Sequence, residues 1–415
     1  MISHVSNVPG CLSRATLFLL FTALMGALIT RSAYAINFND LESVLRQHPQ
    51  IRAMAFESES NLALVKSGMA LPDPVVAIGM NNVPVSTLSF DEYLPSHKAF
   101  GVRQRFPSQA SRQAKSLVRR AHAAHFSEQQ AQLFASMRGE LIGLLHSRER
   151  VSAQRNLAQQ RKAKYIQLLD FVASDVGAGG APVFKLAKID SEQLDVSRAL
   201  ANLNAEEAQI NARLVYLLGH APDVNAPAVV PLVWSGRLGD FYASRVAVTA
   251  LSINKGETQL AKSKWRPEWG AQVTYQQREA GPHFAGDDWV SAMVTFTVPF
   301  WAKQSQAPTL LAAKSRQRAS QLRLNSAERQ AVAEYEHYVQ AYTLALKHAE
   351  ILNKNIHAVS AEISARRRAY ESGAHDYSSV LEGDIMILKL HSDVAFEVAR
   401  AAKIAAKINA LMVMK

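Results

Sequence analysis

Residues 289–299 read Trp-Val-Ser-Ala-Met-Val-Thr-Phe-Thr-Val-Pro, and apolar residues alternate with polar ones along the stretch. One face would carry Val290, Ala292, Val294, Phe296 and Val298; the other would carry Ser291, Thr295 and Thr297, with Met293 as an exception. A period of two indicates a β-strand with unlike faces. We therefore expect a strand here, and about 9–11 residues is the length that a tilted strand needs to cross a membrane.

Three further stretches predict strands, at 269–277, 98–107 and, most weakly, 75–83. Trp265, Trp269, Trp289 and Trp301 flank the second pair, as in the aromatic girdles of membrane barrels. The alternation fits either a membrane barrel, apolar outside and polar inside, or a soluble hairpin with one buried face. The tryptophans and the secretion signal described below favour the barrel.

The chain also repeats itself. Pro72 and Pro267, Pro107 and Pro299, and Gly179 and Gly373 form three pairs, each separated by 192–195 positions. We expect a first repeat at 36–222, a proline-rich linker at 223–238 and a second repeat at 239–415. Each repeat should run helix, two strands, very long helix, glycine turn and very long helix.

Two stretches, 108–172 and 304–371, have a helical pattern, and each would span roughly 100 Å at about 1.5 Å per residue. A heptad seam in the second indicates coiled-coil packing. The seam consists of Tyr338, Tyr342, Ala345, Ala349, Leu352, Ile356, Val359 and Ile363. A returning helix is expected at 377–414, so the two glycine turns predict two long antiparallel hairpins.

Residues 1–35 read as a secretory signal peptide, with Arg14, an apolar run at 15–29 and an Ala-Tyr-Ala cleavage site at 33–35. The single cysteine, Cys11, lies within it, so we expect no disulfide, thiolate metal site or cofactor in the mature chain. The net charge of +11 falls to about +9 without Arg14 and Arg31. Charges scattered along helices of a secreted protein do not predict nucleic-acid binding.

Four strands cannot close a membrane barrel, because the smallest bacterial barrels have eight. Open strand edges in lipid leave backbone groups without hydrogen bonds. We therefore expect a homotrimer, in which three copies supply twelve strands and twelve long helices. The predicted fold class is mainly α with a small β part: coiled-coil hairpins form an α-barrel, and four strands per chain contribute to a trimeric 12-stranded transmembrane β-barrel.

The chain resembles the TolC family of outer-membrane efflux factors over 38–412. Its motifs are Leu-Pro-Asp-Pro at 71–74, Gln-Arg-Phe-Pro at 104–107, Gly-Gly-Ala-Pro at 179–182, Leu-Leu-Gly at 217–219, Val-Pro-Phe at 298–300 and Tyr-Glu-Ser-Gly at 370–373. The resemblance implies a passive, non-enzymatic channel in the outer membrane of a Gram-negative bacterium. It also implies a periplasmic adaptor and an inner-membrane transporter as partners. The first motif, with Asn-Val-Pro at 82–84, is most similar to members paired with heavy-metal pumps; drug export is the other expectation.

The resemblance also implies a periplasmic mouth with two carboxylates three residues apart. These positions hold Ser379 and Glu382, so Glu382 fits the pattern and Ser379 departs from it. Asp376 and Asp384 are the other candidate pore acids, which would attract cations. A solvated helix face is the alternative for each of these residues.

A tyrosine and an arginine latch the mouth in the family, and Tyr370 and His375 stand at these positions. Gly179, Gly180 and Gly373 would form the tips that dock the adaptor. In the first repeat the positions equivalent to the mouth carboxylates hold Lys185 and Lys188, which we expect to pair with acids of a neighbouring copy.

No catalytic motif for a nucleotide, zinc-protease or serine-hydrolase site occurs, which disfavours a secreted hydrolase. His122 and His125 share a helix face without a third ligand nearby, so we expect a packed or solvated pair. The main alternative is a periplasmic adaptor, which should have one hairpin and no duplication.

Overall fold

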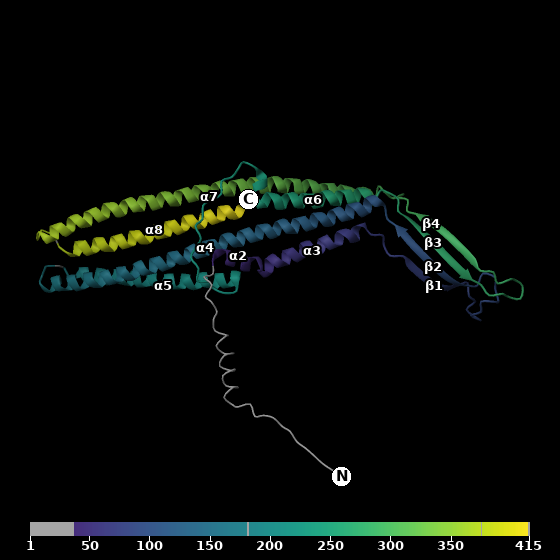
Figure 1. Ribbon diagram of the computed structural model, residues 1–415, viewed down its shortest axis with the longest axis horizontal. Coiled ribbons are helices and arrows are strands. Elements are labelled where there is room, and N and C mark those ends of the chain that lie inside the picture. The colour runs from purple at the N-terminus through teal and green to yellow at the C-terminus, as the bar shows by residue number, and fades with distance from the viewer. Residues whose placement is uncertain (1–36, 181, 375, 414–415) are drawn as a thin grey trace, which may run out of the picture.

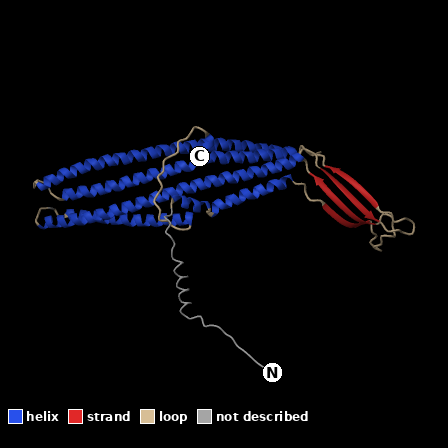
Figure 2. Ribbon diagram, viewed as in Figure 1, coloured by secondary structure: helices blue, strands red, loops and turns tan. Residues whose placement is uncertain are grey.

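The computed structural model describes residues 37–180, 182–374 and 376–413. The predicted signal peptide at 1–35 and the candidate latch residue His375 lie outside the described residues. Long helices run side by side for most of the length of the molecule, and a small sheet projects from one end (Figures 1 and 2). The two hairpin tips lie at the opposite end, at the left of Figure 1.

The first half of the chain contains α2 (Phe38–Arg46), α3 (Pro49–Met69), β1 (Val75–Asn81), β2 (His97–Phe106), α4 (Gln109–Gly177) and α5 (Phe184–Leu218). The second contains the short 3-10 helix η1 (Leu238–Asp240), α6 (Tyr242–Ser263), β3 (Trp269–Gln277), β4 (Trp289–Phe296), α7 (Gln306–Glu371) and α8 (Ser378–Leu411). The order helix, strand, strand, very long helix, long helix therefore occurs in both halves.

Two of the predicted strands end earlier than expected. β1 stops at Asn81 and not at 83, because Asn82 takes a left-handed conformation with φ 54° and Pro84 follows. β4 stops at Phe296 and not at 299, because Phe296 pairs with Trp269, the first residue of β3, and later residues have no partner in the ladder. The 98–107 strand is shifted by one residue, and the 269–277 strand is confirmed at both ends.

The two longest helices have 69 and 66 residues, so each is about 100 Å long. Ser108 caps α4, because its hydroxyl accepts a hydrogen bond from the backbone N–H of Ser111 at 3.2 Å. The predicted heptad seam of α7 is confirmed: Ala345, Ala349, Ile356 and Ile363 are buried, and its other four members are partly buried.

The long helices form a wall in the order α5, α4, α8 and α7, with α3 against α4, and α6 against α4 and α7 (Figure 1). Small residues allow α4 and α8 to approach closely. A Cβ at Gly139 would lie 2.9 Å from both the carbonyl oxygen of Ala406 and the Cβ of Ala410. The wall is held by separate apolar clusters, one of which lies beneath the tips and includes Leu168, Val196 and Leu381.

The segment between the halves is tied to the middle of this wall. The Arg148 side chain donates a hydrogen bond to the carbonyl oxygen of Val224 at 2.6 Å, and Asn409 accepts one from the backbone of Leu232 at 2.7 Å. The backbone N–H of Val413 donates to the carbonyl oxygen of Asp240 at 2.8 Å. These bonds anchor the segment and the end of α8 together.

The strands form one antiparallel sheet in the order β1-β2-β3-β4. Its register aligns Ile78, Phe100, Tyr275 and Val290 in one row across the sheet. The neighbouring row of the same face consists of Val76, Val102, Val273 and Ala292. The opposite face carries Arg103 beside Gln272, and Gly101 beside Thr274 and Ser291. The register therefore collects most of the large apolar positions of the four strands on one face, and Val75 and Met293 are exceptions that lie beside Arg103 and Gln272.

Among the described residues no helix covers either face of this sheet (Figure 2). Every residue of β1 and β4 is exposed, and the apolar side chains of Ile78 and Val290 are 82% and 70% exposed. The aromatic rings of Phe106 and Trp269 stack at 4.0 Å at the end nearest the helices, and Trp289 begins β4 at the far end. No described helix combines the length and the hydropathy that a membrane span requires.

Candidate functional site at the hairpin tips

Both tips close with the same backbone motif. Gly179 and Gly373 take left-handed conformations, with φ of 80° and 74°. The N–H of Gly180 donates to the carbonyl oxygen of Asp175 at 2.9 Å, and that of Ala374 donates to the oxygen of Ala369 at the same distance. This is the Schellman arrangement, which requires the left-handed residue that glycine supplies at least cost.

Aromatic rings join the two hairpins just below the tips. Tyr377, at the start of α8, contacts Phe171 of α4 at 5.9 Å and Tyr370 of α7 at 5.0 Å between ring centroids. Tyr370 is 43% exposed, and no described residue hydrogen-bonds to its hydroxyl. The candidate latch tyrosine is therefore held by ring packing in this state.

Two of the three candidate pore acids have partners within the chain. The Asp376 carboxylate accepts hydrogen bonds from the backbone N–H of Ser378, at 3.1 Å, and from its hydroxyl, so it caps the first turn of α8. The Asp384 carboxylate pairs with Lys164 of α4 at 2.9 Å. Glu382 is exposed, and none of the described residues forms an ion pair or a hydrogen bond with it. Of these acids, only Glu382 has a free carboxylate.

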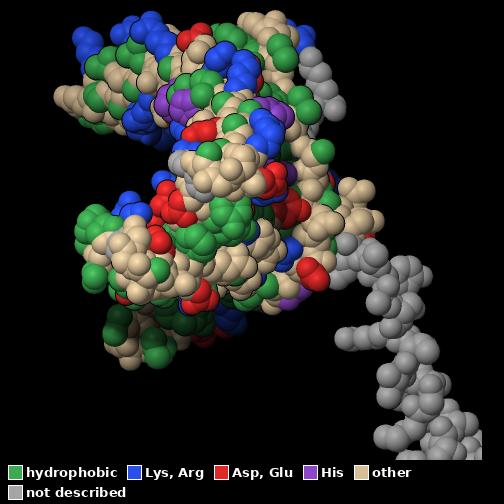
Figure 3. Space-filling model, turned by 90° about the vertical axis from the view of Figure 1, so that its left-hand side faces the viewer, with side chains coloured by type: hydrophobic (Ala, Val, Ile, Leu, Met, Phe, Trp, Pro, Cys, Tyr) green, Lys and Arg blue, Asp and Glu red, His purple; other side chains and the backbone are tan. Residues whose placement is uncertain are grey.

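Glu382 lies on the rim of a groove that we call the tip groove, with a volume of about 590 Å³. Its floor is α4, and its walls are α5 and α8. The lining residues are Arg161, Tyr165, Leu168, Val172, Phe184, Lys185, Lys188, Ile189, Glu192, Asp195, Ser378, Glu382, Ile385, Met386 and Lys389. The structure thus brings Lys185 and Lys188 together with Glu382 of their own chain. Seen from the tips, cationic and anionic side chains are mixed on this end of the molecule (Figure 3).

Sequence reasoning missed a polar pair in the floor of the tip groove. The Tyr165 hydroxyl, from a ring that is 5% exposed, donates a 2.6 Å hydrogen bond to Glu192. Burial, followed by the hydrogen bond and charge of Glu192, raises the pKa of Tyr165 to about 12, although Arg161 acts in the opposite direction. Tyr165 lies among the buried residues of α4, between Ala158 and Val172, so in the sequence it looks like an ordinary core residue.

Replacing Tyr165 with Phe should change how stability depends on alkaline pH. An unfolded tyrosine ionises near pH 10, whereas folded Tyr165 keeps its proton to about pH 12. The folded state therefore binds the extra proton, and stability should fall as pH rises from about 10 to 12. In Tyr165→Phe this part of the fall should be absent from thermal unfolding curves. Tyr93→Phe, at an exposed tyrosine, is the control and should keep the full fall; equal falls in both variants would contradict the assignment.

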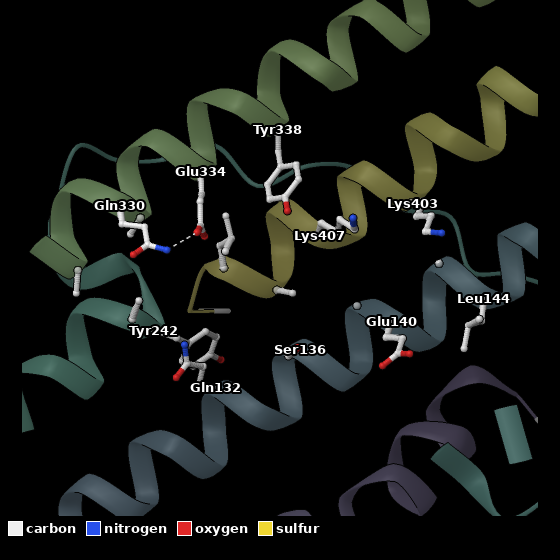
Figure 4. A pocket seen from close by; sticks show the side chains of 17 residues that line it. Gln132, Ser136, Glu140, Leu144, Tyr242, Gln330, Glu334, Tyr338, Lys403 and Lys407 are labelled. Atoms are coloured by element: carbon white, nitrogen blue, oxygen red, sulfur yellow. Dashed lines mark hydrogen bonds between the residues drawn. The ribbon is translucent and has the colours of Figure 1, made fainter. Parts of the chain in front are cut away.

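A second cavity, of about 640 Å³, lies between α4, α6, α7 and α8. Glu334, Tyr338, Lys403 and Lys407 line it from α7 and α8, and Gln132, Glu140 and Leu144 from α4 (Figure 4). Its carboxylates are engaged: Glu140 pairs with Arg213, and Glu334 accepts a 2.8 Å hydrogen bond from Gln330. The cavity lies toward the C-terminal end of α8, away from the tips.

One member of the histidine pair on α4, His125, is packed against α6, which is one of the two states expected for the pair. The His125 ring forms a 3.0 Å hydrogen bond with the Thr249 hydroxyl of α6, and burial lowers the pKa of His125. Within 37–180, 182–374 and 376–413, no three histidine, cysteine or acidic residues are arranged to hold a metal ion.

Comparison with known proteins gives a clear result for the fold. No protein-family model matches the sequence, and no curated protein matches it. CusC, whose crystal structures concern folding and transmembrane channel formation, aligns with a TM-score of 0.72 and 13% identity over 90% of this chain and 92% of its own. The chain has a TolC-like fold. The outer membrane protein VceC of Vibrio cholerae aligns with a TM-score of 0.73 and 12% identity over 90% of this chain and 95% of its own.

The open state of the Neisseria gonorrhoeae MtrE outer membrane channel is a further match, with a TM-score of 0.67 and 16% identity. It covers 89% of this chain and 88% of that one. The alignments cover about nine-tenths of this chain, so the TolC-like fold extends over both the helical wall and the sheet. At identities this low the similarity establishes the architecture, and the function has to be argued from the residues.

Proposed function

We propose that this protein is an outer-membrane channel subunit of a multi-component efflux system in a Gram-negative bacterium. The observation that carries the proposal is the sheet, which has one continuous apolar face with no described element packed on it. An apolar face of this kind needs lipid or another protein to cover it. The attached helices of about 100 Å are long enough to continue a conduit away from the membrane.

The open edges of the sheet support a trimer. β1 and β4 each have one edge that pairs with no other strand among the described residues. Such edges are not tolerated in lipid, because their backbone groups lack hydrogen bonds. Pairing β4 of one copy with β1 of the next closes a 12-stranded barrel from three four-stranded sheets. We propose that the halves 36–222 and 239–415 are an internal repeat joined by the linker 223–238.

Cell fractionation and sizing test this proposal. The mature protein should sediment with outer membranes and run as a trimer in mild detergent. A periplasmic adaptor with one hairpin is the alternative, and it would have no barrel to insert. A soluble periplasmic monomer would overturn the channel proposal.

The partners follow from the same proposal. A periplasmic adaptor docks on the tips at Gly179, Gly180 and Gly373, and an inner-membrane transporter supplies the energy. The channel itself is passive, without a cofactor, and conducts a heavy-metal ion or a drug. Support for these roles comes from the family resemblance of the tip motifs and from the matched channels.

Glu382 is the proposed pore acid, because Asp376 and Asp384 are engaged within the chain. Tyr370 and His375 are the proposed latch. If three Glu382 carboxylates converge on the axis, Glu382→Gln should reduce cation selectivity, measured as a reversal potential across a salt gradient in planar bilayers. Glu57→Gln on α3 is the control. An unchanged reversal potential would place Glu382 outside the conduction path.

A further inference from the structure

We propose that the tip groove is a binding site for an amphiphilic anion, a small molecule with an apolar body and a carboxylate, sulfonate or phosphate headgroup. This proposal concerns binding and goes beyond the conduction proposed above. The volume of about 590 Å³ lies within the range of about 300–1,000 Å³ that is typical of small-molecule sites.

The middle of the groove suits an apolar body. Leu168, Ile189 and Ile385 are buried and form its floor and lower walls. Phe184 and Met386 lie at its edge with 70% and 41% of their surface exposed. A large aromatic side chain that is exposed to solvent beside an apolar floor is typical of a ligand pocket and not of a hydrophobic core.

The cationic side chains of the groove have unused capacity to bind an anion. None of Lys185, Lys188 and Lys389 forms an ion pair with any described residue. Arg161 lines the groove, and its Nε is buried without a hydrogen-bond acceptor. A buried guanidinium N–H without an acceptor is costly, so an anionic oxygen of a ligand would satisfy it.

The groove has more cations than acids. Four cationic side chains, Arg161, Lys185, Lys188 and Lys389, face three carboxylates, and one of these, Asp195, pairs at 2.9 Å with Arg198, which does not line the groove. Glu192 stays charged while it accepts the hydrogen bond of Tyr165, and Glu382 has no partner among the described residues. The groove therefore favours an anion over a cation.

The directions of the helices place the headgroup. α4 runs toward the tips, whereas α5 and α8 run away from them (Figure 1). Arg161 is the first lining residue of α4 and Lys389 the last of α8, so both lie at the end of the groove away from the tips. We place the headgroup there and the apolar body along Ile189 and Ile385 toward Phe184. Glu382 lies nearer the tips, beside the body of the ligand.

The test is equilibrium dialysis of the full-length mature protein in phosphatidylcholine nanodiscs, with empty nanodiscs as the blank. The two probes are pyrenebutyrate and its cationic counterpart, pyrenebutyl-trimethylammonium. Pyrenebutyrate should bind saturably at one site per chain, at least ten-fold more tightly than the cation. Arg161→Gln and Lys389→Gln should each weaken it at least five-fold, and Glu382→Gln should strengthen it.

Lys314→Gln, at an exposed lysine of α7, is the matched control and should leave binding unchanged. If Arg161→Gln fails to fold, the affinity of Lys389→Gln, a substitution at the rim of the groove, is the deciding measurement. Equal affinity for both probes, or no loss in Lys389→Gln, would overturn the anion site and would favour a groove that receives a partner helix. Because binding is measured without conduction, this result is independent of whether the protein exports anything.

Discussion

Val273→Lys should prevent the protein from inserting into the outer membrane as a trimer. Val273 lies in the central strand β3, 51% exposed, between Val102 and Ala292 on the apolar face. A lysine on the lipid face of a membrane barrel costs about 2–4 kcal/mol near the midplane. Each of the three chains in the barrel would carry this cost, so the assembled trimer should be lost or strongly destabilised.

The neighbouring residue supplies the control for this substitution. Gln272 lies on the opposite, polar face, beside Arg103. Gln272→Lys should therefore insert and form trimers normally, although it adds the same charge one position away. Heat-modifiable trimer bands and outer-membrane fractionation measure both variants. Equal behaviour of the two would mean that the apolar face does not meet lipid, and would support a soluble sheet instead.

Gly373→Val should abolish export while leaving trimers in the membrane. At φ 74° a β-branched residue is strained by about 1–2 kcal/mol, so the turn and its hydrogen bond from Ala374 to Ala369 should rearrange. The proposed adaptor contact would lose its geometry, whereas the sheet at the other end of the molecule would not be affected. Retention of a fluorescent pump substrate in whole cells measures export.

Gly177→Val is the matched control for the tip. Gly177 ends α4 close to the other tip, without a left-handed φ, and a Cβ at this position would lie more than 4 Å from any group beyond its own helical turn. A valine there should be accommodated with little change in export. Unchanged export in Gly373→Val, at matched expression, would count against a docking role for the second tip.

The strands and long helices were predictable because their signals are local. The period-two pattern of 269–277 and the heptad seam of α7 each depend on residues that follow one another in the chain. The strand ends at 81 and 296 were harder to predict, because alternation continues past Asn82 in β1 and past the residue of β4 that pairs with the start of β3. The two glycine turns were recognisable since few other residues take a left-handed conformation.

The hydrogen-bond and ion-pair partners of the candidate site residues were not predictable from the sequence. Asp376, Glu382 and Asp384 look alike as exposed acids near a turn, yet Asp376 caps α8 and Asp384 pairs with Lys164, which lies 220 positions earlier. Lys185 and Lys188 line a groove with Glu382 of the same chain, and their expected pairing with acids of a neighbouring copy stays a prediction. Helical periodicity says which face a residue occupies and not which distant helix that face meets.

Short-range periodicity and backbone preference, both visible in the amino-acid sequence, specify the four strands, the two very long helices and the two glycine turns. Their combination into a sheet and a helical wall became known from the three-dimensional structure. The register across β1-β2-β3-β4 placed most of the large apolar residues on one face, and the packing of α5 and α8 on α4 created the tip groove with its unpaired Arg161 Nε. Register and helix neighbours depend on contacts between residues far apart in the chain, which no local pattern encodes.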